Sequence, residues 1–459
     1  MINYFNFKQF DNEYLLTNDF GKYMFVTKEE LRSLIDNSVD FSSDFGRKAE
    51  ENYFAFQCSK RAFADKAKHL MRESKSYLFQ STGLHIFVVT NSCNMQCVYC
   101  QAQNGNDHPH GMMDHKTAER AVDIALQSPN DYLSFEFQGG EPLSNFDTIK
   151  HIVEYTEAKN STKQIEFNLV SNLTLLTEDI ADYIKRHDIK VSTSIDGDML
   201  VHNTNRQYRN GKGTFDDVVS GIELLRSKDV EVGAILTSTR QSLDHANEIV
   251  DAYVSLGLTN VFIRPLTPLG CASNQWSEIG YTPEKFITFY NECFDYILVL
   301  NRQGVNVKEG TAILILPKIL YGNPVNYMEL RSPCGAGIGQ LAYYYDGNVY
   351  TCDEGRMLSE MGDDSFRLGN VYHSTYNDLI NNPSCKAACI SSVLESLPEC
   401  SSCVYNPFCG TCPVVNLAQN KNIFQKTAHS YRCKINAGIM DKIFNILKSN
   451  YKQIIEKWV

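Results

Sequence analysis

The chain has 459 residues, more than one compact core normally holds, so domain-size norms suggest about three structural units. Hydrophobic residues make up 43% and charged residues 21%, which argues against long disordered tracts. The 43 basic and 54 acidic residues give a net charge of −11, so we expect no nucleic-acid partner and no anionic membrane partner, because phosphate binding needs a basic surface.

The cysteine content points to metal rather than to disulfides. There are 15 cysteines, an odd number, so they cannot all pair within one chain. Residues 1–8 lack the basic-then-apolar layout of a secretion signal, and no apolar run approaches the ~20 residues that span a bilayer. We therefore expect a cytoplasmic protein with reduced thiols, in which clustered cysteines more often hold metal.

The N-terminal region, residues 1–82, is predicted to be an α+β appendage. Strand-like segments at 14–17 and 23–26 flank a turn at 18–21, which indicates a hairpin. A helix is expected at 27–35, where Thr27 and Glu30 have the spacing of a capping box. Such a module can dock a peptide by strand addition, or it can be a packing appendage.

The middle region, residues 83–310, alternates strand-like and helix-like segments. Strands are predicted at 85–90, 132–137, 164–170, 190–195, 231–237 and 260–264, and helical periodicity occurs at 115–127, around 181, at 215–225 and at 245–256. Six β/α units with right-handed crossovers imply an α/β fold, a partial (β/α)6 TIM-like barrel. Its chemistry should collect where the strands end.

A tight cysteine group follows the first of these strands. Cys93, Cys97 and Cys100 form a C-x3-C-x2-C pattern on a loop. Three thiolates can hold three irons of a cubane and leave the fourth iron open for a substrate or cofactor. Zinc is the alternative, and it would need a fourth ligand such as His108, His110 or His115.

This loop resembles that of the radical S-adenosylmethionine (SAM) superfamily, which carries a [4Fe–4S] cluster. Tyr99 matches the aromatic residue that lies near the adenine in that family. The family motif that holds the methionine amino group is matched after the second strand by Gly139, Gly140, Glu141 and Pro142. An ammonium needs an acceptor, and glycines allow close backbone approach. Without the cluster in register, the same four residues would read as a turn with a solvated Glu.

Further strand ends carry residues that the same resemblance implies as cofactor contacts. Ser171 and Asn172 are similar to the polar pair that contacts the ribose or the SAM carboxylate. The remaining implied SAM contacts are Ser194, Asp196, Arg206 and Ile263, the last through its backbone. For Ser194, Asp196 and Arg206, a structural role is the alternative. The chemistry implied is reductive cleavage of SAM to methionine and a 5′-deoxyadenosyl radical that removes hydrogen from a substrate.

A second cysteine array lies in the C-terminal region, residues 311–459. Its spacing suits metal sites, with a zinc ribbon as the physical alternative. The order resembles the SPASM extension of peptide-modifying radical SAM enzymes, which holds two auxiliary [4Fe–4S] clusters. The resemblance implies one closed cluster on Cys400, Cys403, Cys409 and Cys433, and three irons of another on Cys334, Cys352 and Cys412.

Two departures from the SPASM pattern concern the first auxiliary cluster. Two residues separate Cys409 from Cys412, where the family usually has three, and residues 325–333 lack the cysteine that full-ligand versions carry. That cluster has either an open iron or a ligand from Cys385 or Cys389. The other thiols, Cys58, Cys271 and Cys293, are interpreted as buried and apolar.

Asp353 is the candidate catalytic residue. Cys352 and Asp353 resemble the Cys-Asp step of sulfatase-maturing relatives, in which the aspartate is proposed to take a substrate proton. Oxidising a carbon radical releases a proton, so a carboxylate beside an auxiliary cluster makes chemical sense. A capping aspartate is the structural alternative.

Three functions are compatible with these patterns. The first is a radical SAM/SPASM maturase that crosslinks, epimerises or oxidises a ribosomally made precursor peptide, and segments 5–21 and 97–101 are similar to the maturase of the His-Xaa-Ser peptide system. The second is an anaerobic sulfatase-maturing (formylglycine-generating) enzyme, although the long segment before Cys93 argues against it. The third is a zinc- or iron-binding scaffold, which leaves the Gly-Gly-Glu-Pro motif unexplained. The radical chemistry implies a flavodoxin or ferredoxin as reductant.

Overall fold

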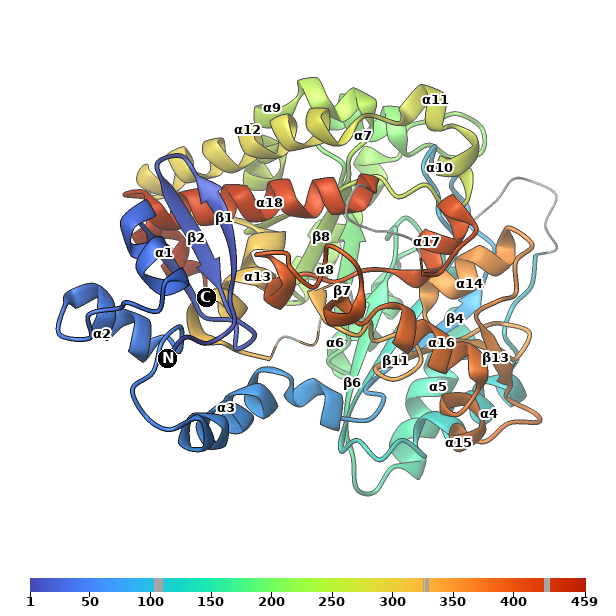
Figure 1. Ribbon diagram of the computed structural model, residues 1–459. Helices are drawn as coiled ribbons and strands as arrows, with labels where there is room; N and C mark the ends of the chain where they lie inside the picture. The colour runs from blue at the N-terminus through green and yellow to red at the C-terminus, as the bar shows by residue number, and fades with distance from the viewer. Residues whose placement is uncertain (103–109, 325, 327–329, 425–429) are drawn as a thin grey trace.

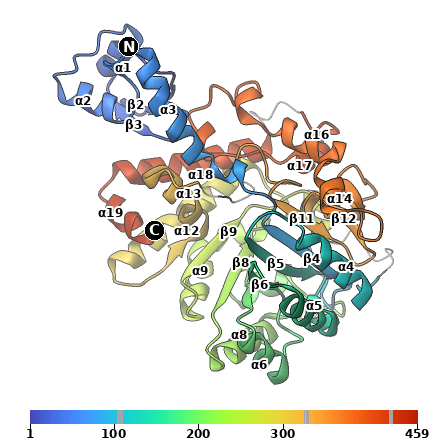
Figure 2. The same ribbon diagram turned by 90° about the horizontal axis from the view of Figure 1, so that it is seen from below.

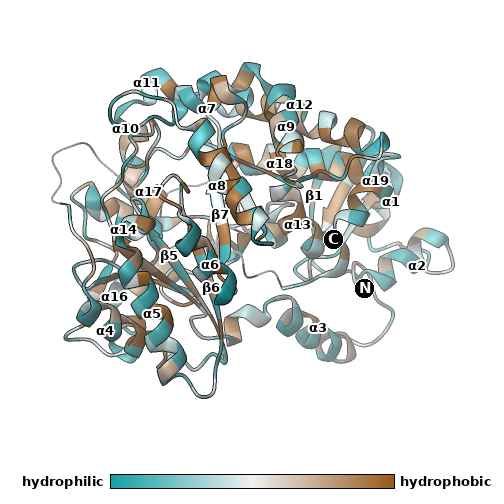
Figure 3. Cartoon of the chain, turned by 180° about the vertical axis from the view of Figure 1, so that it is seen from behind, coloured by the Kyte–Doolittle hydropathy of each residue, from teal (hydrophilic) through white to brown (hydrophobic). Residues whose placement is uncertain are grey.

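The computed structural model describes residues 1–102, 110–324, 326, 330–424 and 430–459. A central sheet with helices on its outer side forms the largest part, and the cysteine-rich segments pack beside it (Figure 1). The N-terminal residues form a separate small module at one side (Figure 2). In Figure 3, hydrophobic residues follow the strands and the inward sides of the helices, as amphipathic elements around one core require.

The central sheet contains the six predicted strands, in sequential order and all parallel. They are β4 (Leu84–Thr90), β5 (Tyr132–Gly139), β6 (Gln164–Val170), β7 (Lys190–Ser194), β8 (Val232–Thr237) and β9 (Asn260–Arg264). A short strand, β10 (Lys308–Glu309), adds to β9 in parallel. The α/β partial-barrel prediction is confirmed.

Helices connect successive strands and cover one face of this sheet. They are α4 (His115–Ala125), α5 (Phe146–Lys159), α6 (Glu178–Arg186), α7 (Met199–Asn205), α8 (Phe215–Ser227) and α9 (Ala246–Ser255). Asp114, Thr177 and Asp198 cap three of them at the N-terminus. The strands alternate, so that Phe135 and Phe137 of β5 are buried. Ser134, Glu136 and Gln138 on the opposite face are only partly buried, which gives the inner face of the partial barrel a polar row.

The C-terminal region continues the same sheet. Strand β11 (Gln340–Tyr343) pairs in parallel with β4 and antiparallel with β12 (Asn348–Tyr350), which pairs with β13 (Arg367–Asn370). The sheet therefore runs across the 310/311 boundary inferred from the sequence, and that boundary stays a prediction. The helices of this half are α10 (Cys271–Asn274), α11 (Trp276–Ile279), α12 (Pro283–Arg302), α13 (Gly310–Tyr321), α14 (Asp353–Glu360), α15 (Tyr376–Ile380), α16 (Pro383–Ser391), α17 (Pro413–Asn420), α18 (Tyr431–Lys448) and α19 (Lys452–Ile455).

The long helices α12 and α18 lie side by side and join the barrel to the cysteine-rich part (Figure 1). Gly438 of α18 sits against Ile287 of α12, where a Cβ atom would lie 2.4 Å from the isoleucine Cδ1 atom. The glycine thus permits the close approach of the two helices.

The N-terminal module has the predicted hairpin and capped helix. It comprises β1 (Asn6–Phe10), β2 (Glu13–Thr17), β3 (Tyr23–Val26), α1 (Lys28–Ile35), α2 (Asp44–Glu51) and α3 (Lys60–Ser74), and Thr27 and Glu30 form the capping box. The module contacts the cysteine-rich part directly. Thr17 donates to the Val404 carbonyl at 2.6 Å, and Lys8 pairs with Asp441 at 2.6 Å.

Among the described residues, no helix is both long enough and apolar enough to cross a membrane.

Two buried histidines predict an acid-sensitive fold. Burial lowers the pKa of His85 and of His202 to about 3. An unfolded histidine titrates near 6.5, so the unfolded chain binds more protons below that pH and the free energy of unfolding falls as pH drops from about 6.5 towards 3. Between pH 7 and pH 5 we expect each histidine to account for about 2 kcal/mol of this loss. Urea unfolding of the metal-free chain at both pH values measures it.

The matched comparison for this prediction is His85→Gln against His115→Gln. His115 has an exposed side chain on α4, and His115→Gln controls for the change of residue type. Between pH 7 and pH 5, the free energy of unfolding of His85→Gln should fall by about 2 kcal/mol less than that of the wild type. Equal pH dependence in all three proteins would contradict the prediction.

Candidate functional site

The first cysteine loop follows β4 and is held by the segment after α7. The Val98 amide donates to the Asn205 carbonyl at 2.9 Å, and the Gln96 amide donates to the Gln207 carbonyl at 2.7 Å. These bonds fix the loop that carries all three cysteines. Burial raises the pKa of Cys93 to about 12, and the nearby Cys97 thiol adds to the rise. Cys97 and Cys93 likewise raise the pKa of Cys100, after burial. The three thiols are therefore near neighbours.

A fourth thiol lies beside this loop. Cys271, which the sequence interpretation set aside as a structural thiol, donates its amide to the Cys100 carbonyl at 2.8 Å. Its charge adds to the raised pKa of both Cys97 and Cys100. Spacing could not reveal this neighbour, because 170 residues separate it from Cys100 in the sequence.

The two glycines of the Gly-Gly-Glu-Pro motif let β5 end directly against the cysteine loop. A Cβ atom on Gly139 would lie 2.3 Å from the Thr90 carbonyl oxygen, and one on Gly140 would lie 2.2 Å from the Ser92 carbonyl oxygen. The Gly140 amide donates to Thr90 at 2.9 Å and the Glu141 amide to Ser92 at 2.8 Å. Side chains at these positions would break this contact.

Glu141 is fully buried and accepts three hydrogen bonds. Its carboxylate accepts from the Ser171 hydroxyl at 2.7 Å, the Asn172 amide at 2.8 Å and the Leu143 amide at 2.9 Å. Burial raises its pKa, and these hydrogen bonds lower it. The carboxylate thus ties the end of β5 to the end of β6, and Pro142 opens the short turn that follows.

The polar pair after β6 reaches the cysteine loop. The Asn172 side-chain amide donates to Asn94 at 2.9 Å and lies 4.0 Å from the Cys93 sulfur. Ser171 and Asn172 are both buried. The structure therefore brings together the first cysteine loop, the glycine–glutamate motif and this pair, as expected for strand ends that meet at one edge.

Tyr99, Asp196 and Arg206 form one buried polar network. The Tyr99 hydroxyl donates to Asp196 at 2.7 Å and accepts from Arg206 Nη1 at 2.8 Å. The Arg206 charge lowers the pKa of the Cys97 thiol, against the larger effect of burial. Arg206 Nε is buried and has no hydrogen-bond partner among the described residues. A donor in that condition fits an anionic group such as the carboxylate of SAM.

Ser194 and Ile263 lie at the ends of β7 and β9. Ser194 is partly buried, whereas the Ile263 side chain is fully buried, so only its backbone can face a ligand, as the sequence interpretation required.

The first site's donor set fits a thiolate-bound cluster with SAM beside it. Three neighbouring thiols share one loop. The buried Arg206 Nε, which has no hydrogen-bond partner among the described residues, lies next to them. Among the described residues, no group of three or more Cys, His, Asp or Glu side chains is arranged to hold a single metal ion, so the fit to a cluster rests on the chemistry of the three thiols and on their shared loop. Of the zinc-ligand candidates, His108 lies outside the described residues, and His115 pairs with Asp147 and stacks on His151.

The quartet in the C-terminal region surrounds a common pocket. This pocket of about 480 Å³ is lined by Cys400, Cys403, Cys409 and Cys433 together with Asn436 and others. Burial, followed by the charges of the other three thiols, raises the pKa of Cys433 to about 12. The Asn436 side chain donates to the Cys409 sulfur at 3.6 Å. Four thiols around one space fit a closed [4Fe–4S] cluster.

The second group is a buried trio. Cys334, Cys352 and Cys412 share one hydrophobic cluster, and burial raises the pKa of Cys334 to about 11. The charges of Glu354 and of the other two thiols add to the raised pKa of Cys352. Cys385 instead packs against Gly337, where a Cβ atom would lie 2.3 Å from its sulfur. The trio fits three irons of a cluster.

Asp353 forms an ion pair with Arg356. Its carboxylate accepts from Arg356 Nη2 at 2.5 Å and from Arg356 Nε at 3.1 Å, at the first residue of α14. Sequence reasoning missed the carboxylate beside it, Glu136, which lies on the inner polar row of β5 and bonds Gln138. Burial raises the pKa of Glu136, with contributions from Asp353 and Glu354, while Arg264 opposes them. The alternation of polar residues along 132–138 was the available signal.

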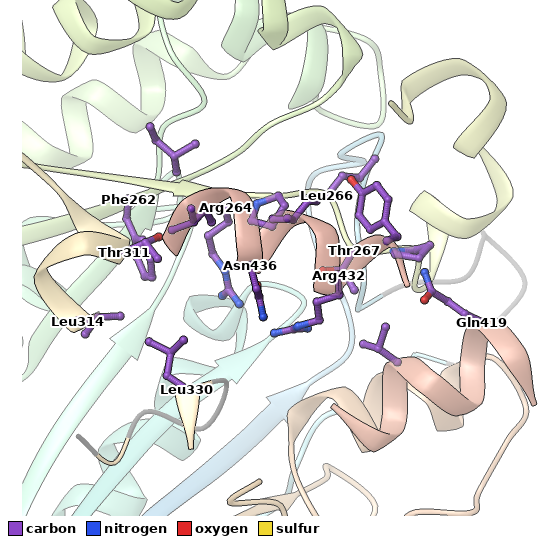
Figure 4. A pocket seen from close by; sticks show the side chains of 17 residues that line it. Phe262, Arg264, Leu266, Thr267, Thr311, Leu314, Leu330, Gln419, Arg432 and Asn436 are labelled. Carbon is purple, nitrogen blue, oxygen red and sulfur yellow. The ribbon is translucent and has the colours of Figure 1, made fainter. Parts of the chain in front are cut away.

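A pocket of about 750 Å³ lies between the barrel and the cysteine-rich part. It is walled by the end of β9 and residues 265–268, by α13, and by the facing sides of α17 and α18. Figure 4 shows Arg264, Arg432 and Asn436 pointing into it, opposite Leu314 and Leu330. A mostly apolar wall with a few converging polar groups is typical of ligand sites.

Comparison with known proteins identifies the barrel. Residues 87–252 match the model of the radical SAM superfamily, so the chain contains a radical SAM domain. This match confirms the cofactors expected from the sequence, which are SAM and iron–sulfur clusters. An uncharacterized protein of Methanocaldococcus jannaschii is 37% identical over 183 residues, 40% of this chain and 62% of that relative. The cysteine-type anaerobic sulfatase-maturating enzyme of Clostridium novyi is 24% identical over 72% of this chain and 87% of its own length.

Solved structures share the fold. The structure described as native anSMEcpe with bound AdoMet has a TM-score of 0.68 at 22% identity, covering 81% of this chain and 99% of that one. Streptococcus suis SuiB bound to its precursor peptide SuiA has a TM-score of 0.55 at 15% identity, covering 92% of this chain and 97% of that one.

Proposed function

From the radical SAM domain at residues 87–252, we propose that this chain is a peptide-modifying radical SAM enzyme with two auxiliary iron–sulfur clusters. The observation that carries the proposal is the pocket between the end of β9 and α18, because it adjoins the barrel on one side and shares Arg432 and Asn436 with the pocket of the cysteine quartet on the other. A peptide held there would reach the SAM side and the auxiliary side at once. SuiB, the relative with a precursor peptide bound, covers nearly the whole chain.

The chain's own residues have distinct parts in this proposal. Cys93, Cys97 and Cys100 hold the cluster at which SAM binds. When both are bound, the cluster and SAM would supply reductive cleavage of SAM to a 5′-deoxyadenosyl radical. Arg206 Nε offers the unpartnered donor for the SAM carboxylate. The Gly140 and Glu141 backbone, bonded to Thr90 and Ser92, sets the distance between the loop and the motif.

Asp353 and Glu136 are the candidate proton acceptors on the substrate side. Asp353 is held by Arg356, and Glu136 lies within reach of its charge. A carboxylate facing the barrel interior can take the proton that a substrate releases on oxidation. We retain Asp353 as the catalytic candidate drawn from the Cys352–Asp353 step.

The N-terminal module is proposed to dock the precursor. It carries an exposed apolar surface that includes Tyr4, Phe7 and Ile35, and it is tied to the cysteine-rich part through Lys8 and Asp441. Exposed aromatic residues on a small sheet suit strand addition by a peptide. Residues 5–21 also carry the similarity to the His-Xaa-Ser system maturase, which remains part of the proposal. A cytoplasmic location and a flavodoxin or ferredoxin reductant complete it.

The alternative is an anaerobic sulfatase-maturing enzyme. It is favoured by relatives with that name, which are 24–28% identical over 65–72% of this chain, and by the Cys352–Asp353 step. Residues 1–82, with their own sheet and helices, precede the barrel and weigh against it.

One experiment separates the two functions. The reconstituted enzyme, SAM and dithionite are incubated with the peptide encoded by a short reading frame beside the gene, and separately with a sulfatase peptide that contains the Cys or Ser to be oxidised. A SAM-dependent mass change in the first peptide supports the maturase, and formylglycine in the second supports the alternative. No mass change in either peptide, with 5′-deoxyadenosine formed, would overturn both.

Loss of the closed auxiliary cluster should uncouple SAM cleavage from peptide modification. Cys403 lines the quartet's pocket and lies outside the first cysteine loop. Cys403→Ala is therefore expected to form 5′-deoxyadenosine still, while peptide modification falls by at least about tenfold, a loss of some 1.4 kcal/mol in transition-state stabilisation. Both products are quantified by mass spectrometry. Equal loss of both would contradict the separation of roles.

A further inference from the structure

A second pocket lies where the N-terminal module, α13 and the cysteine-rich part meet. It has a volume of about 630 Å³ and shares no lining residue with the pocket at the end of β9. Its walls come from the turn at 19–21, from residues between 71 and 77 around the end of α3, from the end of α13 and from residues 406–409. Figure 2 shows α3 leading from the N-terminal module towards the rest of the molecule.

Lys318 is a buried cation in the wall of this pocket. It belongs to α13, and only 7% of the residue is exposed. Its Nζ donates one hydrogen bond, to the Leu330 carbonyl at 2.5 Å, and it forms no ion pair with any residue in the described part of the chain. An ammonium has three donor hydrogens, and burying it without an opposite charge costs free energy. The site therefore suits a ligand that brings a carboxylate.

The other charged side chains of the wall define which anion fits. Lys75 forms an ion pair with Glu395, and the Glu395 carboxylate also accepts from the Ser332 hydroxyl at 2.6 Å. Asp19 lines the pocket from an exposed position in the turn. Because two carboxylates already line the wall, a singly charged carboxylate fits beside Lys318 better than a doubly charged phosphate does.

Exposed apolar side chains flank the same pocket. Leu78 and Phe79 directly follow Tyr77 of the wall, and Tyr321 directly precedes Gly322 of the wall. All three are exposed, and Phe79 is 73% exposed. Large exposed apolar residues beside a pocket are typical of interaction sites. A peptide with apolar residues on either side of an acidic one matches both the flanks and the buried lysine.

We propose that this pocket anchors an acidic side chain of the substrate peptide, with the Asp or Glu carboxylate on Lys318 and apolar neighbours against Leu78, Phe79 and Tyr321. The inference rests on the proposed function, since it takes the occupant to be part of the precursor. The pocket is separate from the one at the end of β9, so it holds a different segment of the peptide from the one that is modified. Lys318 is thus a specificity-determining residue for the peptide.

The experiment measures binding to the reconstituted full-length chain by isothermal titration calorimetry, without dithionite. The probes are the acetylated and amidated peptide Leu-Phe-Glu-Leu and its counterpart with Gln in place of Glu. Lys318→Met removes the buried charge. The matched control is Lys66→Met, which removes an equal charge from an exposed position on α3 that does not line the pocket.

The wild type is expected to bind the Glu peptide at least about tenfold more tightly than the Gln peptide, because a hydrogen bond between two charged groups is lost with Gln. Lys66→Met should keep this preference, and Lys318→Met should bind both peptides equally. Equal affinities in the wild type, or a preference that survives in Lys318→Met, would overturn the inference. So would tight binding of the Gln peptide that appears only when its C-terminus is left free.

A second measurement needs no variant, in case Lys318→Met holds less iron than the wild type. The Phe of the Glu peptide is replaced by photoreactive benzoylphenylalanine, and crosslinks to the wild type are mapped by mass spectrometry. They are expected within residues 75–79 or 318–323, and crosslinks confined to other segments would contradict the proposal. Because no radical chemistry is needed, loss of the acid preference while the earlier assay still shows a mass change overturns this inference alone. An earlier assay without a mass change overturns the proposed function whatever these affinities are.

Discussion

Replacing Cys97 with alanine is expected to abolish formation of 5′-deoxyadenosine. Cys97 is the middle thiol of the first loop and a proposed cluster ligand, and its charge raises the pKa of its neighbours Cys93 and Cys100. Two thiolates cannot hold three irons of a cubane, so the open iron that binds SAM would be lost. Iron should fall from roughly twelve to roughly eight per chain, because the auxiliary clusters remain. Iron analysis and chromatography of the reaction measure both quantities.

Cys271→Ala is the matched control for this prediction. Cys271 lies beside the same loop, and its charge raises the pKa of Cys97 and of Cys100. If the site is an open cluster, this fourth thiol is dispensable, and the variant should keep wild-type iron and 5′-deoxyadenosine. If all four thiols instead form a closed site, Cys271→Ala should lose metal as Cys97→Ala does. That outcome would remove the open coordination position on which SAM cleavage depends.

Gly140→Ala is expected to disable the SAM site without touching a ligand. The added methyl would lie 2.2 Å from the Ser92 carbonyl oxygen, on backbone that cannot swing aside as a side chain can. Either the cysteine loop or the end of β5 must move, which breaks the bonds from Gly140 to Thr90 and from Glu141 to Ser92. Overpacking of this kind costs up to about 3 kcal/mol of folding free energy. Because a displacement of about 1 Å at a reacting site can cost roughly 100-fold in rate, we expect SAM cleavage to fall by roughly 100-fold.

Gly233→Ala provides the control for the glycine prediction. Gly233 also lies in a strand of the central sheet, but a Cβ atom there would meet only the Val191 carbonyl oxygen, at 3.8 Å. The variant should retain wild-type SAM cleavage and iron content. Wild-type cleavage in Gly140→Ala would show that the loop and the motif do not depend on each other's position.

The local patterns of the barrel were predictable from the sequence because they are short-range. Apolar, β-branched or aromatic runs located the strands that became β4 to β9, and the capping box of Thr27 and Glu30 located α1. The parallel order followed from the repeated β/α units, and it brought the Gly139–Glu141 segment to the Cys93 loop.

Long-range contacts account for what the sequence did not reveal. Cys271 reaches the first loop from 170 residues away, and β11 joins β4 from the far side of the assumed domain boundary. No local spacing encodes these neighbours, because they arise from how segments far apart in the sequence pack together.

The resemblance to the SPASM pattern predicted the grouping of the C-terminal cysteines. Cys400, Cys403 and Cys409 are close in sequence, and the late Cys433 joins them because α18 returns to the same pocket. Cys334, Cys352 and Cys412 assemble in one apolar cluster. Neither Cys385 nor Cys389 is among the thiols that raise the pKa of Cys352 most, so the trio's fourth ligand stays a prediction to be tested by iron spectroscopy.

The most direct test of the account is the formation of 5′-deoxyadenosine. The chain is reconstituted anaerobically with iron and sulfide, then mixed with SAM and dithionite, and the products are separated by chromatography. We predict 5′-deoxyadenosine and methionine in equal amounts, from protein that holds roughly twelve irons per chain. Protein that carries its iron but forms no 5′-deoxyadenosine, or protein that binds two to three zinc ions in place of iron, would contradict the central claim.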